Sequence, residues 1–129
     1  GDSTFVHSGL TGIVEMVYNK PETGHLLLIL DNGTTAMTGM QEHPGTGRRL
    51  DHTPGGKLDI EGIARALGLE RVYTIDPAED TAGFERLVRE CLDSNEVSLI
   101  VARRPCKLAE KRIAAYEQAA QQGCPANVS

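Results

Sequence analysis

Two polar segments of the sequence combine residue types that commonly hold divalent metals and phosphates. The first is GDS, in which Gly1 permits a tight turn and Asp2 supplies a carboxylate. The second is DNGTT, in which the Asn32 side chain and the Thr34 backbone carbonyl are further oxygen donors. Magnesium prefers hard oxygen ligands and completes its octahedron with water and phosphate oxygens. The two segments therefore predict a site for Mg²⁺ and a diphosphate.

The distance between the segments along the chain suits one site. Asp2 precedes Asn32 by about 30 residues, the typical length of one strand, helix and strand unit. In an open parallel sheet, the loops at the carboxyl ends of the strands bind ligands, so the second loop would return beside the first. Spacing alone fits an alternative equally well, in which Asp2 and Asp31 only cap helices or form turns.

Hydroxyl groups next to these carboxylates and amides could donate hydrogen bonds to phosphate oxygens. We also expect a helix to begin near His7 or Ser8, with a positive dipole at its N-terminus. His7 itself fits two roles, either a cap of that helix or a hydrogen-bond partner of substrate or cofactor. The hydroxyl residues are Ser3, Thr4, Thr35 and Thr38.

Apolar periodicity predicts the elements that would position these residues. Short continuous apolar runs predict buried strands covered on both faces, and spacings of three and four predict helices between them. Asp59, and Asp80 or Thr81, are expected to cap helices, and Gly68 to end one. The expected strands are 25–30, 72–75 and 97–102, and the expected helices are 8–18, 60–67, 81–92 and 108–121.

Alternating strands and helices predict an α/β fold, a three-layer open and mostly parallel sheet with helices on both faces. We expect residues 1–106 to form this domain, without its first strands, since nothing upstream of Gly1 feeds the Gly-Asp turn. Residues 107–129 would be a surface helix and a tail. The loop 38–57 has no periodic pattern and is long enough to be either functional or disordered.

Composition excludes several classes of function. The net charge of -5, with two Phe, three Tyr and no Trp, disfavours nucleic-acid binding. The apolar runs are too short to span a membrane. Three widely spaced cysteines fit no disulfide framework, so we expect a reducing cytoplasm.

In the long loop, His43, Asp51 and His52 could be metal ligands, although solvent-exposed or supporting histidines are the more common finding. Arg48 and Arg49 could contact a carboxylate or a phosphate of coenzyme A, but we expect them to form a solvated turn.

The segments GDSTFVHSG, LDNGTTAMTGMQEHPGTGRRL and VARRPC closely resemble the thiamine diphosphate-binding portion of the indolepyruvate:ferredoxin oxidoreductase catalytic subunits, within the 2-oxoacid:ferredoxin oxidoreductases. The resemblance spans residues 1–106, and DNGTTAMTGMQEHPGTG is its most specific stretch. It implies that Asp2, Asn32 and the Thr34 carbonyl bind Mg²⁺. It places the following residues near the diphosphate or thiazolium: Gly1, Ser3, Thr4, His7, Thr35, Met37 and Thr38.

For the complete enzyme, the resemblance implies oxidative decarboxylation of an aryl-pyruvate such as indolepyruvate to an acyl-CoA, with ferredoxin accepting the electrons. Coenzyme A, ferredoxin, iron-sulfur clusters and the remaining domains or subunits would be its partners, in an oligomer. The domain whose glutamate activates the cofactor is missing from the sequence, and Cys124 alone cannot replace a four-cysteine cluster module. We therefore expect the isolated fragment to have negligible turnover.

Two alternatives stay open. One is a thiamine diphosphate-dependent 2-oxoacid decarboxylase that does not use ferredoxin. The other is a regulatory or scaffold module that keeps the fold without the chemistry.

Overall fold

The computed structural model describes residues 1–122 and contains a three-stranded parallel sheet. The strands are β1 (His25–Asp31), β2 (Arg71–Ile75) and β3 (Val97–Arg103), and their order is β1-β3-β2. Because all three strands run in the same direction, their carboxyl ends share one edge. The register pairs Asp31 of β1 with Arg103 of β3 at that edge.

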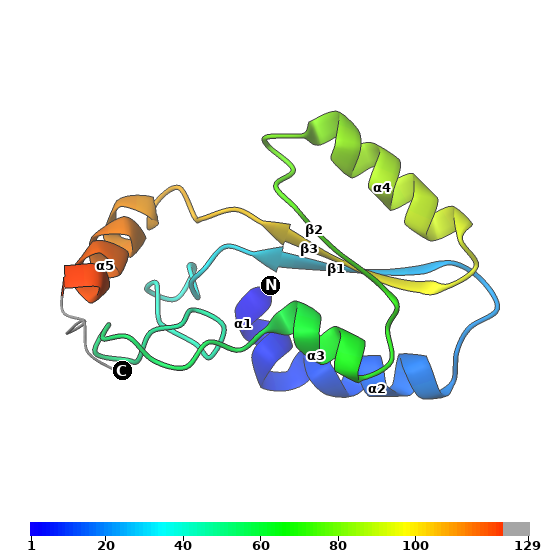
Figure 1. Cartoon of the computed structure of the whole chain (residues 1–129), viewed down its shortest axis with the longest axis horizontal. Helices are drawn as coiled ribbons and strands as arrows, with labels where there is room; N and C mark the ends of the chain where they lie inside the picture. Colours follow the sequence, from blue (N-terminus) through cyan, green and yellow to red (C-terminus); the bar gives the residue numbers. More distant parts are fainter. Residues whose placement is uncertain (123–129) are drawn as a thin grey trace, which may run out of the picture.

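Helices cover both faces of this sheet, which confirms the predicted three-layer α/β fold (Figure 1). One face carries a helical run made of α1 (Asp2–Thr4), the π-helical turn η1 (Phe5–Gly9) and α2 (Leu10–Tyr18), together with α3 (Ile60–Ala66). The other face carries α4 (Thr81–Asp93). The last helix, α5 (Glu110–Gln122), lies past the carboxyl ends of the strands, next to the long loop.

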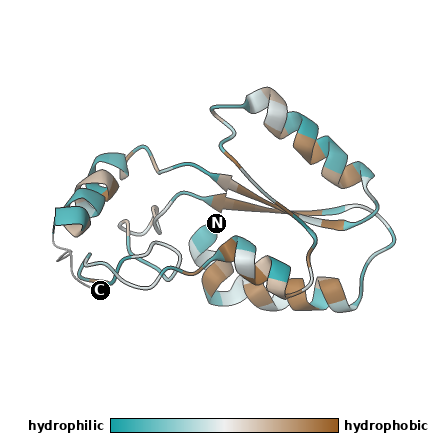
Figure 2. Cartoon of the chain, viewed as in Figure 1, coloured by the Kyte–Doolittle hydropathy of each residue, from teal (hydrophilic) through white to brown (hydrophobic). Residues whose placement is uncertain are grey.

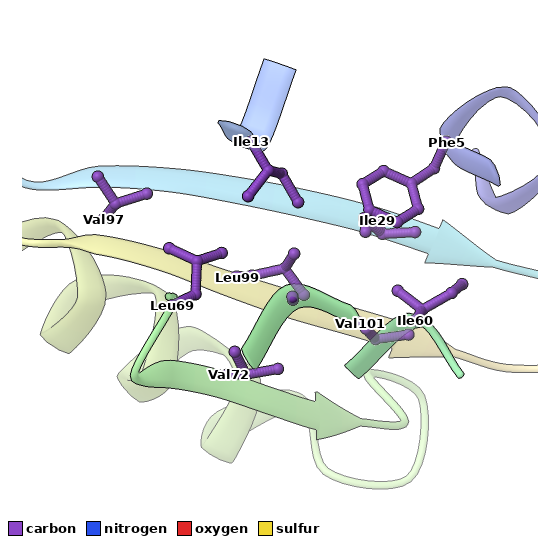
Figure 3. Packing of buried hydrophobic residues seen from close by; sticks show 10 residues of the cluster. Phe5, Ile13, Ile29, Ile60, Leu69, Val72, Val97, Leu99 and Val101 are labelled. Atoms are coloured by element: carbon purple, nitrogen blue, oxygen red, sulfur yellow. The ribbon is translucent and has the colours of Figure 1, made fainter. Parts of the chain in front are cut away.

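The hydrophobic core lies between the sheet and the helices α1 to α3. Its side chains alternate along β3, where Val97, Leu99 and Val101 point toward Phe5 and Ile13 of the amino-terminal helical run (Figure 3). The helices of this layer contain many apolar residues, whereas α5 is mostly hydrophilic and has no buried residue (Figure 2). The core therefore fixes the amino-terminal helical run against the sheet, and α5 is a surface helix as expected.

Only the central strand is covered on both faces, so the prediction of three fully covered strands is wrong. Six of the seven residues of β3 are buried, but in β1 only Ile29 is. Leu28 and Leu30 point to the α4 side and are 40% and 57% exposed. A single helix on that face cannot reach across all three strands, so an edge strand with a continuous apolar sequence stays partly open.

The first helix begins at Asp2 and not near residue 8. In its first backbone hydrogen bond, the Phe5 amide donates to the Gly1 carbonyl at 3.0 Å, and the helical run continues to Tyr18. The spacing of apolar residues from Leu10 onward does not reveal this start. A π-helical turn at Phe5–Gly9 has one extra residue, so Phe5 and Ile13 are not related by the regular helical spacing. The expected dipole at His7 is therefore absent, since His7 lies inside the helical run.

Other element limits agree with the sequence predictions. The side chain of Asp59 accepts a hydrogen bond from the Gly62 amide, and Asp80 does the same for Gly83, so both act as helix N-caps. Within residues 1–122, no helix is long and apolar enough to cross a bilayer. Cys124 and the rest of the tail lie outside the described residues.

Candidate functional site

The Asp2 carboxylate lies at the carboxyl edge of the sheet, in the first turn of the helical run, and is only 2% exposed. Its Oδ1 accepts a hydrogen bond from the Ser3 amide at 2.9 Å, and its Oδ2 accepts one from the Gly33 amide at 3.0 Å. The second bond joins segments 31 residues apart in sequence. The two polar segments singled out in the sequence therefore meet.

The DNGTT segment forms a tight turn directly after β1. The Thr34 amide donates to the Asn32 side-chain oxygen at 3.3 Å, and Thr34 is buried. Gly33 has a positive φ of 73°, a conformation that glycine adopts without strain, and this turns its amide toward Asp2. The turn thus brings Asn32 and Thr34 next to the residue that contacts Asp2.

The predicted hydroxyl residues divide into two groups. Ser3 and Thr35 meet across the site, with the Thr35 hydroxyl donating to the Ser3 oxygen at 2.8 Å. Thr38 instead bonds the Gln41 side chain at 2.7 Å, farther along the loop. The remaining predicted contacts, Thr4, His7 and Met37, are exposed.

His43 is buried on Asp2, so of the two expected roles it has the supporting one and not the solvent-exposed one. Its Nε2 lies 3.2 Å from Asp2 Oδ2, and the two side chains are 1% and 3% exposed. The alternative metal cluster with Asp51 and His52 does not form, because Asp51 bonds Thr53 instead. Within the described residues, no group of three or more His, Cys, Asp or Glu side chains is placed to hold a metal.

A second buried carboxylate, Glu42, holds the long loop together. Its Oε1 accepts hydrogen bonds from Arg48 Nε and from His52 Nδ1, each at 2.9 Å. Arg48 also donates to the Gly33 carbonyl at 3.1 Å, which ties the loop to the turn after β1. The expectation of a solvated turn is therefore wrong for Arg48, whereas Arg49 is exposed.

This network also attaches α5. The His52 ring stacks on Tyr116 with centroids 4.3 Å apart and an interplanar angle of 6°. Contacts within the loop, with the turn after β1 and with α5 therefore hold the loop in place.

Asp31 lies beside Asp2 but has its own cation. Arg103 Nε donates to Asp31 Oδ2 at 2.7 Å, and its other nitrogen reaches Glu61 at 2.8 Å. The Gly33 amide also contacts Asp31 Oδ1 at 3.3 Å, so it lies between the two carboxylates. Burial lowers the pKa of Arg103, but the two carboxylates raise it above its ordinary value, so the guanidinium stays charged.

Asp2 remains ionised although it is buried. Burial raises the pKa of its carboxyl, but the hydrogen bonds from His43 and from the Ser3 amide contribute to a net pKa below the ordinary value of 3.8. The pKa of Asp2 is also lowered by the neighbouring Asp31 side chain, and within residues 1–122 no lysine or arginine is among its hydrogen-bond partners. A buried negative charge of this kind favours a cation from outside the described chain.

A small pocket of about 130 Å³ opens beside this edge, between the sheet end, the long loop and α5. Gly33, Arg48 and Arg103 are among its lining residues. Pockets that enclose a cofactor typically measure about 300–1,000 Å³. Asp2, Asn32 and Thr34 do not line this pocket, so it lies next to the predicted metal ligands and does not contain them.

Comparisons with known proteins identify the family of the chain. The family described as "Thiamine pyrophosphate enzyme, C-terminal TPP binding domain" matches residues 1–102. The chain belongs to this family. Asp2, Asn32 and Thr34 lie in the matched part of this TPP-binding domain, and so does His43. No solved structure matches the chain significantly.

Curated relatives of this TPP-binding domain include the indolepyruvate oxidoreductase subunit IorA of Pyrococcus horikoshii, which is 41% identical over 108 residues. The match covers 84% of this chain and 16% of that subunit. The corresponding subunit of Archaeoglobus fulgidus is 39% identical over 112 residues, which are 87% of this chain and 18% of that subunit. The resemblance found in the sequence is confirmed, and the chain spans less than a fifth of these relatives.

Sequence reasoning missed the positions of His43, Glu42 and Arg48. The motif EHPGTG could have predicted the position of His43, because a Pro-Gly turn after His43 bends the chain back and can direct the ring inward. The register that places Asp31 opposite Arg103 could have been found by aligning the ends of the two predicted strands.

Proposed function

We propose that this domain binds thiamine diphosphate through Mg²⁺, as part of an oxidoreductase that decarboxylates 2-oxoacids of the indolepyruvate type. The proposal rests on one observation: the buried Asp2 carboxylate contacts the turn 32–34 and has no lysine or arginine as a hydrogen-bond partner among residues 1–122. Membership of the TPP-binding family and the IorA relatives support the choice of cofactor and substrate class.

The donor set fits magnesium chemically. One carboxylate from Asp2, one amide oxygen from Asn32 and the carbonyl of Thr34 are hard oxygen donors, and Mg²⁺ usually takes one or two carboxylates plus phosphate and water. The Asp2 carboxylate is already held by backbone amides, which favours a fixed ligand. We propose these three residues as the metal ligands.

The remaining residues would position the diphosphate and the ring. We assign Gly1, Ser3, Thr4, Thr35 and Thr38 to the diphosphate, Met37 to contact with the cofactor, and His7 to the substrate side. The Ser3 and Thr35 hydroxyls already face each other at 2.8 Å and could both turn toward a phosphate oxygen. When bound, thiamine diphosphate supplies a nucleophilic carbon and an electron sink for decarboxylation, while the protein supplies binding, orientation and electrostatics.

The fully exposed Met37 side chain supports a site that other parts of the enzyme complete. In the whole enzyme we propose ferredoxin as electron acceptor through iron-sulfur clusters, coenzyme A as acyl acceptor, an oligomeric state and a cytoplasmic location. The chain alone would then have negligible turnover.

Calorimetric titration with thiamine diphosphate and Mg²⁺ tests the binding proposal in the complete oxidoreductase subunit that carries this domain, with its partner subunits. We expect binding that requires Mg²⁺ and that is lost in Asp2→Asn and in Asn32→Ala. Asp80→Asn is the matched control, because it makes the same chemical change at the cap of α4 on the opposite face.

The alternatives give different results. Failure of the wild-type complex to bind would contradict the proposal and favour a scaffold module. Binding followed by aldehyde release, with no reduction of ferredoxin, would favour the decarboxylase.

A further inference from the structure

His43 is the most deeply buried titratable side chain in contact with the candidate metal ligands. Its side chain is 1% exposed, and its Nε2 lies 3.2 Å from Asp2 Oδ2. The contact joins residues 41 apart in sequence, so the fold and not local geometry creates it. A polar ring buried in this way needs a hydrogen-bond partner for each nitrogen.

The turn that follows His43 fixes the orientation and the tautomer of its ring. The Gly45 amide donates to Nδ1 at 3.1 Å, and both the amide and the hydroxyl of Thr46 donate to the His43 carbonyl at 2.9 Å. An amide can only donate, so Nδ1 must carry a lone pair and the proton must lie on Nε2. His43 therefore accepts from the Gly45 amide at Nδ1 and donates its Nε2–H to the Asp2 carboxylate.

This hydrogen bond fixes the orientation of Asp2. The carboxylate accepts three hydrogen bonds, from the Ser3 amide on Oδ1 and from the Gly33 amide and His43 on Oδ2. A carboxylate has about four acceptor positions in all. One position is left, on Oδ1, and it is available to a cation.

We infer that His43 is a positioning residue that orients the Asp2 carboxylate as a metal ligand. It does so through Nε2–H and is itself neither a ligand nor a participant in the chemistry. The inference rests on the proposed Mg²⁺ and thiamine diphosphate site. Outer partners that hold a metal ligand in place typically change metal affinity 10- to 100-fold when removed.

Three variants separate orientation from simple packing. His43→Leu keeps a side chain of similar volume but removes the N–H donor, whereas His43→Gln keeps an N–H donor at a similar distance from the backbone. Gly45→Ala keeps His43 but displaces it, because a Cβ at position 45 would lie 3.0 Å from His43 Cε1 and 3.2 Å from Nδ1.

The experiment measures Mn²⁺ binding in the presence of thiamine diphosphate, by electron paramagnetic resonance, in the complete oxidoreductase complex. Mn²⁺ replaces Mg²⁺ as a spectroscopic probe. We expect His43→Leu to weaken Mn²⁺ binding about 10- to 100-fold and to broaden the Mn²⁺ signal. His43→Gln should restore most of the affinity, and Gly45→Ala should show an intermediate loss. Thermal unfolding without metal and cofactor reports separately on packing.

The outcomes separate the inference from the function on which it rests. Wild-type affinity in His43→Leu, with binding lost in Asp2→Asn, would overturn the role of His43 alone. Equal losses in His43→Gln and His43→Leu would also overturn it, since the donor would then not be the cause. Equal binding in wild type and Asp2→Asn would overturn the proposed function and the inference together. If His43→Leu does not fold, unchanged affinity in Gly45→Ala is the result that overturns the inference.

Discussion

Two buried carboxylates, Asp2 and Glu42, lie in neighbouring regions and have different hydrogen-bond partners. Glu42 receives a guanidinium from Arg48 and a second bond from His52, so its charge is matched inside the loop. Asp2 receives hydrogen bonds from amides and from His43, and within residues 1–122 no guanidinium or ammonium group is among these partners. The difference indicates that Glu42 serves the fold of the loop, whereas Asp2 is held ready for a cation.

Both carboxyl groups stay ionised for related reasons. Burial raises the pKa of Glu42, but the hydrogen bonds from Arg48 and His52 contribute to a net pKa below its ordinary value. In Asp2 hydrogen bonds likewise outweigh burial, although no lysine or arginine is among them. Ionisation alone therefore does not distinguish a structural carboxylate from a ligand, but the charge of its partners does.

The largest expected effect comes from breaking the structural pair. Arg48→Met should lower the free energy of unfolding by roughly 3 kcal/mol, because it leaves the buried Glu42 charge without its guanidinium. Urea unfolding followed by circular dichroism measures this loss. The double variant with Glu42→Gln should recover part of it, since both charges are then removed. Exposed ion pairs contribute up to about 1 kcal/mol. A smaller decrease than this in the free energy of unfolding would mean that Glu42 does not depend on Arg48, which would contradict the comparison with Asp2.

A second prediction uses ligand-induced stabilisation. At a concentration 100 times its dissociation constant, Mg²⁺ with thiamine diphosphate should stabilise the protein by about 2.7 kcal/mol. Asp2→Asn should abolish this increment, whereas Glu42→Gln should lower the starting stability but keep the increment. Thermal unfolding of each variant in the complete subunit, with and without ligands, gives both quantities. An increment lost equally in both variants would contradict the comparison.

Acid should weaken the loop through Glu42. Its pKa is lowered on folding, so the unfolded chain binds the proton at a higher pH than the folded chain does. The stabilisation is therefore fully present above the ordinary value of 4.5 and is lost as the pH falls below it toward the folded-state pKa. Unfolding free energies between pH 3 and 7 should show this decline, and Glu42→Gln should flatten it. Glu85→Gln, whose side chain is 65% exposed, is the matched control and should not.

The smallest effect is expected where α5 meets the loop. Tyr116→Ala removes the stack on His52 and should cost about 1 kcal/mol, seen as a small decrease in the thermal midpoint. Tyr18→Ala is the control, since Tyr18 is 86% exposed and has no such partner among the described residues. Equal midpoints in the two variants would mean that the stack does not hold α5.

Local patterns predicted much of the fold. Apolar runs located all three strands to within a residue or two, and Asp59 and Asp80 cap the helices that they were expected to cap. These features depend on neighbours within four residues, so the sequence contains them directly. The start of the first helix was missed because a π-helical turn interrupts the regular spacing.

The sequence by itself determined the fold class and the family, because apolar periodicity and motif residues can be identified along the chain. It predicted that the GDS and DNGTT segments meet, but spacing alone left a capping or turn role of Asp2 and Asp31 open. Only the tertiary structure decided that the segments meet and which buried carboxylate is paired with a guanidinium. The partners of Asp31 and Asp2 lie 72 and 41 residues away, in Arg103 and His43. Contacts over such separations depend on how the whole chain packs, so local signals such as EHPGTG favour a direction of the chain but do not fix the partner.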